Sequence, residues 1–180
     1  MQSAVEPAAG VSGGAQYLTF TLGEENYGID ILRVREIKGL TPVTPIPGAP
    51  RFVPGVMNLR GSVIPVVDLR LRFGLPAADD SRFRVVIVAT VLSPPAEKTV
   101  GLLVDAVSQV MEFEPGRQIQ PPDFGSRGNT RFVRGMATLD DRLVVLIDLE
   151  PLWEDTAEVP PPAESGAAGI DEQGDRGTSL

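Results

Sequence analysis

The chain contains no cysteine and no histidine among its 180 residues. Without cysteine, disulfides, thiol catalysis and cysteine-ligated metals are excluded, which fits a reducing compartment. Without histidine there is no imidazole base, no phosphohistidine and none of the usual transition-metal ligand sets. Most hydrolytic triads and most zinc sites are therefore excluded, and we expect no bound metal and no other cofactor.

Basic charge is also scarce. The 16 Lys and Arg residues are outnumbered by 24 Asp and Glu residues, for a net charge of −8, whereas a general nucleic-acid binder needs clustered basic side chains. The N-terminal segment MQSAVEPAAGVSGGAQ has no basic region and no long apolar stretch, which argues against a secretory signal. No apolar run approaches the ~20 residues that a spanning helix needs. We expect a soluble cytoplasmic protein that neither binds nucleic acid nor inserts into the membrane.

Catalytic groups are equally hard to find. Asp68 and Asp148 each follow an apolar run and precede a short helical pattern, so a helix N-cap is the favoured role for both. Asp140 and Asp141 lie between two apolar segments, where aspartate suits a tight turn. Neither an acid–base pair nor a glycine-rich phosphate loop is recognisable. We expect that the protein is not an enzyme.

Two segments poor in large apolar side chains frame the chain. Residues 1–15 are rich in Ala, Gly and Ser, and residues 155–180 combine Pro and Gly with acidic residues. Neither segment can bury enough apolar surface to offset the entropy of ordering it. We expect both to be disordered and the folded region to span residues 16–154.

Strand patterns dominate this region. Leu18, Phe20 and Leu22 alternate with more polar neighbours and predict a half-buried strand. The continuous apolar runs at 63–67 and 143–147 predict strands buried on both faces. Pro65 lies within the first run and cannot donate to a ladder, so we expect an edge or a bulge there.

An internal repeat organises these strands. GVMNLRGSVIPVVDL, residues 55–69, aligns without a gap with GMATLDDRLVVLIDL, residues 135–149. Upstream, YGIDILRVREI from Tyr27 resembles VGLLVDAVSQV from Val100, and Gly28 falls on Gly101. The two matches differ in offset, so one loop changed length between the copies. We predict two related β modules in tandem, roughly residues 16–80 and 81–154, with a possible strand crossover between them.

Modules of this size usually close into small barrels, because closure removes exposed edges. Each alone would have a small core, so we expect the two to pack together and to bury residues such as Leu32 and Leu103 between them. A groove at such a junction is a common location for ligands. Arg60 is either a solvated turn residue or an arginine presented at the rim of that groove to a partner.

Four segments together resemble the CheW family of chemotaxis coupling proteins: YLTFTLGEENYGIDILRVREI, GVMNLRGSVIPVVDLRLRFG, VGLLVDAVSQV and GMATLDDRLVVLIDLEPLW. The most specific part is NLRG-x-V-x-P-V-x-DLR-x-x-FG, and the resemblance covers residues 16–153. It implies a mainly β fold of two five-stranded, SH3-like barrels packed in pseudo-symmetry, with short helices. That architecture agrees with the repeat.

The resemblance also implies a function. Proteins of this family are cytoplasmic adaptors that couple the tip of a chemoreceptor, a methyl-accepting chemotaxis protein, to the regulatory domain of the histidine kinase CheA in membrane-associated arrays. Two alternatives stay open: a paralogous coupler of a non-flagellar chemosensory pathway, and a β domain that binds a small molecule in the groove.

The resemblance further implies site residues. By motif, the receptor-binding groove between the barrels comprises Val34, Glu36, Ile37, Arg60, Val104 and Val107. Apolar anchors with a charge at the rim suit a helical hairpin laid in a groove. Kinase contacts are expected on exposed faces of the barrels, at Val85, Val86 and Phe124. Phe124 is either an anchor in its own barrel's core or an interface plug.

Overall fold

The computed structural model describes residues 14–78, 83–114, 119–120 and 130–154. Its elements are β1 (Ala15–Leu22), β2 (Glu25–Asp30), η1 (Ile31–Arg33), β3 (Val34–Gly39), β4 (Gly55–Leu59), β5 (Ser62–Asp68), α1 (Leu69–Arg72), β6 (Val85–Ser93), β7 (Ala96–Val104), β8 (Ala106–Phe113), β9 (Val133–Leu139), β10 (Arg142–Ile147) and α2 (Leu149–Glu154). The prediction of disorder at 155–180 lies outside the described residues, as does that for 1–13. Ala15, assigned to the N-terminal tail, is already part of β1.

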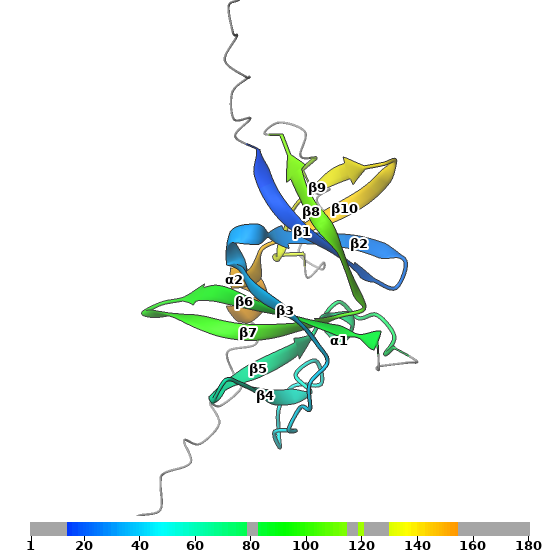
Figure 1. Ribbon diagram of the computed structural model, residues 1–180. Helices are drawn as coiled ribbons and strands as arrows, with labels where there is room; N and C mark the ends of the chain where they lie inside the picture. The colour runs from blue at the N-terminus through cyan, green and yellow to red at the C-terminus, as the bar shows by residue number, and fades with distance from the viewer. Residues whose placement is uncertain (1–13, 79–82, 115–118, 121–129, 155–180) are drawn as a thin grey trace, which may run out of the picture.

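Two five-stranded sheets make up the fold and lie one above the other (Figure 1). Barrel A has the strand order β8-β1-β2-β10-β9, and barrel B has the order β3-β6-β7-β5-β4. Neighbouring strands are antiparallel except for β2 with β10 and β5 with β7, which are parallel. The prediction of a mainly β fold with two five-stranded, SH3-like barrels is confirmed. None of the helices in the described part of the chain is long and apolar enough to cross a membrane.

The expected boundary near residue 80 does not separate the barrels. Barrel A takes β1 and β2 from the first copy of the repeat and β8 to β10 from the second, whereas barrel B takes β3 to β5 from the first and β6 and β7 from the second. The possible crossover therefore occurs twice, at η1 between β2 and β3 and at Asp105 between β7 and β8. Each barrel is a composite of both copies.

The strand register preserves the repeat. Gly28 on β2 lies opposite Leu146 on β10, and Gly101 on β7 lies opposite Val66 on β5, so equivalent residues of the two copies make equivalent pairs. A Cβ on Gly28 would come within 3.1 Å of Leu146 Cδ2, and one on Gly101 within 3.0 Å of Val86 Cγ1. Glycine fits both positions, because a larger residue would require the neighbouring side chain to shift.

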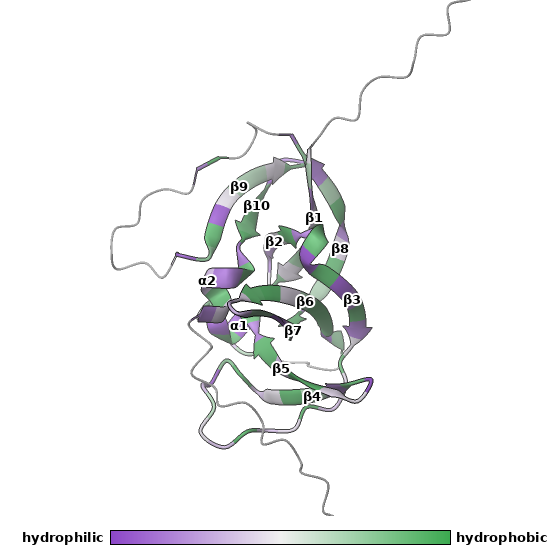
Figure 2. Cartoon of the chain, turned by 90° about the vertical axis from the view of Figure 1, so that its left-hand side faces the viewer, coloured by the Kyte–Doolittle hydropathy of each residue, from purple (hydrophilic) through white to green (hydrophobic). Residues whose placement is uncertain are grey.

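Three apolar clusters fill the molecule. The largest, the shared core, takes side chains from both barrels, including Leu18, Phe20 and Leu22 of β1. Each barrel also has a small interior cluster of its own, and Tyr17 of β1 lies in that of barrel A. β1 is therefore buried on both faces, which corrects the half-buried strand expected from its alternation. Figure 2 shows that β5, β6 and β10 are also apolar along most of their length.

Several apolar residues lie elsewhere than expected. Leu32, expected between the modules, is 88% exposed on η1, and Leu103 packs inside barrel B. Val63 and Leu143 open the two apolar runs but remain about half exposed, at 50% and 47%. Pro65 precedes the ladder between β5 and β7, which begins at Val66, so it occupies a local edge as expected.

The aspartate caps are confirmed. Asp68 accepts hydrogen bonds from the N–H groups of Arg70 at 2.9 Å and Leu71 at 3.3 Å, and Gly74, with φ 75°, follows the short helix α1. Asp148 accepts from the N–H of Glu150 at 3.4 Å in α2. Both helices therefore begin at a carboxylate that directly follows a buried strand.

Candidate partner-binding site

A groove of about 740 Å³ opens between the two edge strands of barrel B. One wall is β3 and the other is the hairpin of β4 and β5, while β6 and β7 form the floor. Its lining residues are Leu32, Arg33, Val34, Arg35, Glu36, Leu59, Arg60, Ser62, Ile64, Val88, Thr90, Glu97 and Thr99. Only its end at η1 reaches the region where the chain crosses between barrels, so the expected inter-barrel groove is instead the mouth of one barrel.

An ion pair spans this mouth. Arg60, at the tip of the β4–β5 hairpin, donates from Nη1 to Glu36 Oε1 at 3.0 Å and from Nη2 to Glu36 Oε2 at 3.1 Å. The Arg60 side chain is 77% exposed, so the pair itself contributes only about 0–1 kcal/mol to stability. Its two parallel hydrogen bonds instead orient the guanidinium across the groove.

The hairpin tip holds Arg60 in an unusual backbone conformation. Its φ is 51°, in the left-handed region that costs a residue with a Cβ about 1–2 kcal/mol. Asn58 Oδ1 accepts a hydrogen bond from the N–H of Gly61 at 2.9 Å and supports the turn. Arg60 is thus a turn residue that also lines the groove, and its presentation to a partner stays a prediction.

A bulge in β3 brings three consecutive residues to the groove. The register against β6 shifts between Val34 and Glu36, so these two and Arg35 all line it. Arg35 donates from Nε to Thr90 Oγ1 at 2.6 Å and anchors β3 to the floor. Ile37 follows the bulge, is 47% exposed and does not line the groove.

The remaining predicted groove residues lie in or against the shared core. Val104 is fully buried there, and Val107 is half buried and opposite Phe20. Val104 cannot present its side chain to a partner in this structure. The motif therefore brings Val34, Glu36 and Arg60 together and places Ile37, Val104 and Val107 elsewhere.

The predicted kinase contacts are also less exposed than expected. Val86 is fully buried in the interior of barrel B, and Val85 is half buried against the shared core. Both lie on β6, a central strand that is covered on both faces. Phe124 lies outside the described residues.

Sequence reasoning missed the floor of the groove. Val88, Thr90 and Thr99 come from β6 and β7, and Thr90 lies directly opposite Thr99 in their ladder. Two threonines within long apolar strands were a signal that one face is open to solvent at that point. The pairing of β6 with β3 could not be predicted, because β3 belongs to the other copy of the repeat.

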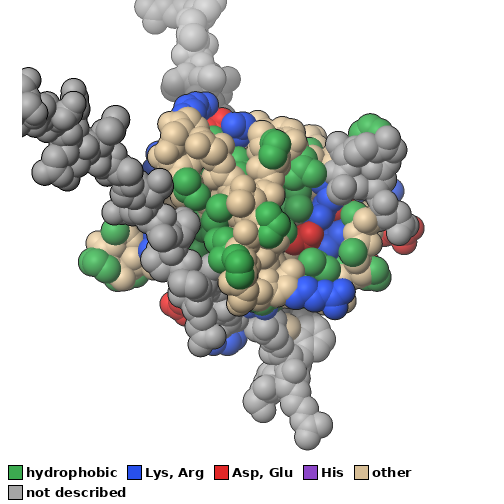
Figure 3. Space-filling view, turned by 90° about the horizontal axis from the view of Figure 1, so that it is seen from below, with side chains coloured by type: hydrophobic (Ala, Val, Ile, Leu, Met, Phe, Trp, Pro, Cys, Tyr) green, Lys and Arg blue, Asp and Glu red, His purple; other side chains and the backbone are tan. Residues whose placement is uncertain are grey.

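Exposed apolar side chains are present on both barrels. Ile37 and Val110 occupy matching positions of the repeat and are 47% and 48% exposed. In the face of the molecule that Figure 3 shows, apolar side chains are spread over the middle, and acidic and basic side chains lie together at the right. Within the described part of the chain, no group of three or more acidic side chains could hold a metal ion.

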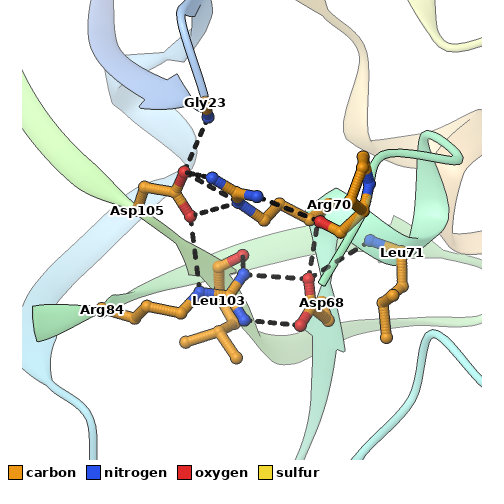
Figure 4. Close-up of polar contacts among 8 residues, drawn as sticks. Gly23, Asp68, Arg70, Leu71, Arg84, Leu103 and Asp105 are labelled. Carbon is orange, nitrogen blue, oxygen red and sulfur yellow. Dashed lines mark hydrogen bonds and ion pairs between the residues drawn. The ribbon is translucent and has the colours of Figure 1, made fainter. Parts of the chain in front are cut away.

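A network of four charged residues joins the barrels at the crossover between β7 and β8 (Figure 4). We call this crossover the first junction, because it contacts the helix of the first repeat copy, and we call the crossover at η1 the second junction. Arg84 donates to both carboxylate oxygens of Asp68, at 2.6 and 2.9 Å, and its Nε lies 3.5 Å from Asp105 Oδ1. Arg70 donates to Asp105 from Nη2 at 2.6 Å, and the N–H of Gly23 in barrel A donates to the same oxygen at 2.7 Å. Burial alone would raise the pKa of Asp105, but the hydrogen bonds from Arg70 and Gly23 outweigh burial and lower it.

The second junction, between β2 and β3, contains a simpler contact. Arg33 on η1 pairs with Glu150 on α2 at 2.9 Å. Burial, reinforced by the neighbouring Asp148, raises the pKa of Glu150, and Arg33 only partly offsets these effects. Both junctions thus link a crossover to the short helix that follows the fifth strand of a repeat copy.

Known proteins share this architecture. The CheW-like domain model matches residues 16–157. The chain is 42% identical over 143 residues to the chemotaxis protein CheW of Rhizobium meliloti, covering 79% of this chain and 89% of that protein. It is 40% identical over 149 residues to the chemotaxis protein CheW of Klebsiella aerogenes, covering 82% and 87%. The crystal structure of scaffolding protein TtCheW from Thermoanaerobacter tengcongensis matches with a TM-score of 0.70 and 36% identity, covering 78% of this chain and 93% of that one.

Proposed function

The chain belongs to the CheW-like domain family, and we propose that this chemotaxis adaptor joins the cytoplasmic tip of a chemoreceptor to the regulatory domain of the histidine kinase CheA. The names of its relatives favour this function over a small-molecule-binding domain or a coupler of another pathway. The adaptor acts in the cytoplasm and reaches the membrane-associated array through its partners. It has no catalytic step of its own.

The observation that carries the proposal is the groove across the mouth of barrel B. Leu32, which is exposed, and Val34 and Leu59, which are half buried, supply apolar surface in the groove. Arg60 and Glu36 form a charged rim. A helical hairpin docks best where apolar anchors meet a groove and a charge fixes its orientation. A receptor carboxylate or the carbonyl end of a receptor helix can share the exposed guanidinium of Arg60 with Glu36.

The other predicted contacts are retained in narrower roles. Ile37 lies on β3 just beyond the groove and can contact a part of the receptor that extends past the rim. Val107 and Val104 affect the receptor site only through the packing of the shared core. For the kinase, Val85, Val86 and Phe124 stay predictions, and Val86 can contribute only by shaping β6.

Signalling then requires the adaptor to bind differently in the two receptor states. A ligand shifts a conformational equilibrium only by its differential affinity for the two states. A receptor tip that moves relative to β3 changes the sharing of Arg60 between Glu36 and the receptor. The kinase detects that change through the barrel it contacts.

The test is co-sedimentation of the full chain with a receptor cytoplasmic fragment and the kinase, with kinase activity as the readout. Arg60→Glu reverses the rim charge and faces Glu36, so we expect at least a ~10-fold loss of receptor affinity, the equivalent of about 1.4 kcal/mol. Arg142→Glu is the matched control, since Arg142 is also an exposed arginine at a hairpin tip, in barrel A. Unchanged binding by a folded Arg60→Glu variant would contradict the proposed site.

A further inference from the structure

A second cavity, of about 320 Å³, lies at the second junction. It is lined by Asp30, Arg33, Arg134, Ile147, Asp148, Leu149 and Glu150. These residues come from the end of β2, from η1, from β9 and from the passage of β10 into α2. The proposed receptor groove shares only Arg33 with this cavity, so the cavity is a separate feature of the surface.

The repeat supplies an internal template for this cavity. Residues 147–150 match residues 67–70 of the first junction, so Asp148 corresponds to Asp68. By the upstream match, Asp30 corresponds to Leu103. Five of the seven lining residues therefore correspond to Asp68 or to residues beside it.

In the first junction an arginine fills the equivalent space. The guanidinium of Arg84 binds both oxygens of Asp68 and lies 3.4 Å from the carbonyl oxygen of Leu103. Its side chain is only 6% exposed. The first junction thus shows, within the same chain, what this kind of site binds and in which geometry.

The second junction has the carboxylate but not the arginine. Val85 is opposite Val104, so the preceding Arg84 is level with Asp105. In the matching ladder of β1 and β2, Tyr17 is opposite Asp30, the residue that corresponds to Leu103. Ala15 lies two residues before Tyr17, as Arg84 lies two residues before the residue opposite Leu103, so Ala15 corresponds to Arg84. The methyl side chain of Ala15 has no charge to pair with Asp148, and the cavity lies beside that carboxylate.

Among the charged residues that line the cavity, the three carboxylates of Asp30, Asp148 and Glu150 outnumber the two arginines. Asp148 makes no ion pair with any residue in the described ranges, and Arg33 is already paired with Glu150. Arg134 lines the cavity but is exposed and makes no ion pair with Asp148. Burial and the nearby Asp148 raise the pKa of Glu150, as expected where carboxylates lie together without enough positive charge.

We propose that this cavity binds the guanidinium of an arginine on a partner protein, with Asp148 as the bidentate acceptor in the geometry that Arg84 adopts on Asp68. Arginine suits the site better than lysine because its planar fork matches a carboxylate through two parallel hydrogen bonds. The surrounding carboxylates disfavour a free amino acid, whose own carboxylate would approach Asp30 and Glu150. The site is therefore a docking point on a face other than the receptor groove, and its existence does not depend on the proposed receptor contact.

The first experiment is an NMR titration of the full chain with N-acetyl-arginine methylamide, with N-acetyl-lysine methylamide as the comparison. We expect saturable shifts of the Asp148 and Glu150 signals with the arginine probe and a weaker response to lysine. Asp148→Asn keeps a good helix cap and should lower the affinity for the arginine probe roughly 10-fold, as for the loss of a charged hydrogen bond. Asp140→Asn, at an exposed turn, is the matched control and should leave it unchanged.

The second experiment supplies the arginine within the chain. Ala15→Arg should fill the cavity, abolish binding of the arginine probe and raise the thermal midpoint, whereas Ala15→Leu should do neither. Three results would overturn the proposal: no saturable arginine binding, binding by Asp148→Asn equal to that of the unaltered chain, or free L-arginine binding 10-fold more tightly than the capped probe. The last result would identify a metabolite site. None of these measurements involves a receptor, so their outcome is independent of the Arg60→Glu test.

Discussion

The two junctions between the barrels occupy equivalent positions of the repeat, yet the ion pair between helix and crossover has opposite polarity in the two. At the first, Arg70 on the short helix pairs with Asp105 on the crossover. At the second, Glu150 takes the place of Arg70, and its partner on the crossover is Arg33. An ion pair between helix and crossover is thus present in both, and its polarity is reversed. The fold accommodates either polarity, because the Coulomb energy of an ion pair depends only on the product of its two charges.

The junctions differ more in what surrounds the pair. Arg84 closes the first junction into a buried network, whereas the second has the open cavity beside Asp148. A buried pair is costly to break from one side, because the remaining charge is left without a partner. The side chains of the Arg33–Glu150 pair are 29% and 25% exposed, so solvent screens this pair more and we expect it to cost less to break. The first junction therefore contributes mainly to stability, and the residues of the second junction are available for binding.

The largest effect should come from breaking the first junction. Arg84→Met removes the guanidinium and leaves the Asp68 carboxylate buried and unpaired, so we expect a loss of about 3–5 kcal/mol in the free energy of unfolding. Urea unfolding followed by the fluorescence of Trp153, which lies in the shared core, measures it. Arg33→Met at the second junction is the matched variant and should cost under about 1 kcal/mol. Equal losses would remove the distinction between the junctions.

Asp105 should give the next largest effect. Asp105→Asn weakens the hydrogen bonds from Arg70 and Gly23, for an expected loss of about 1–3 kcal/mol at neutral pH. Because the fold lowers the pKa of Asp105, its stabilising contribution is present above the unfolded value of about 3.9 and is lost as the pH falls through the folded value. Acid unfolding of the unaltered chain should be steeper than that of Asp105→Asn. Parallel curves would show that Asp105 is not a source of acid sensitivity.

Glu150 should give the smallest effect, with the opposite pH dependence. Its pKa is raised in the fold, so the folded state holds its proton more tightly than the unfolded chain does. Stability should therefore fall as the pH rises from the unfolded value of about 4.3 through the folded value. Glu150→Gln should remove this slope and change stability at neutral pH by no more than about 0.5 kcal/mol. A loss of about 3–5 kcal/mol would mean that the pair with Arg33 matters as much as the first junction.

The sequence predicted the elements of the fold well because they follow from local patterns. The matched positions Gly28 and Gly101 predicted the repeat, and the aspartates after the apolar runs predicted the caps at Asp68 and Asp148. The NLRG motif likewise brought Val34, Glu36 and Arg60 to one groove. Each of these features depends on residues close in sequence or on a motif shared with a known family.

The exchange of strands between copies could not be predicted in the same way. Because Val66 faces Gly101 as Leu146 faces Gly28, a strand finds equivalent neighbours in either copy, and the apolar pattern does not choose between them. The connections between consecutive strands decide which barrel each strand joins. One residue, Asp105, separates β7 from β8 and cannot reverse the chain, so β8 continues into the other barrel (Figure 1). The burial of Val104 follows from the resulting shared core, and that of Val86 from the interior of barrel B, neither of which the motif encodes.

The composite barrels have a consequence for how such a molecule could arise. A single copy of the repeat holds two strands for one barrel and three for the other, so on its own it completes neither. Two separate copies would complete both barrels only by trading strands, as in a domain-swapped dimer. The present chain has the architecture of such a dimer whose halves have been fused into one polypeptide. Cutting it between residues 78 and 83 should accordingly yield two fragments that fold when mixed and not when apart.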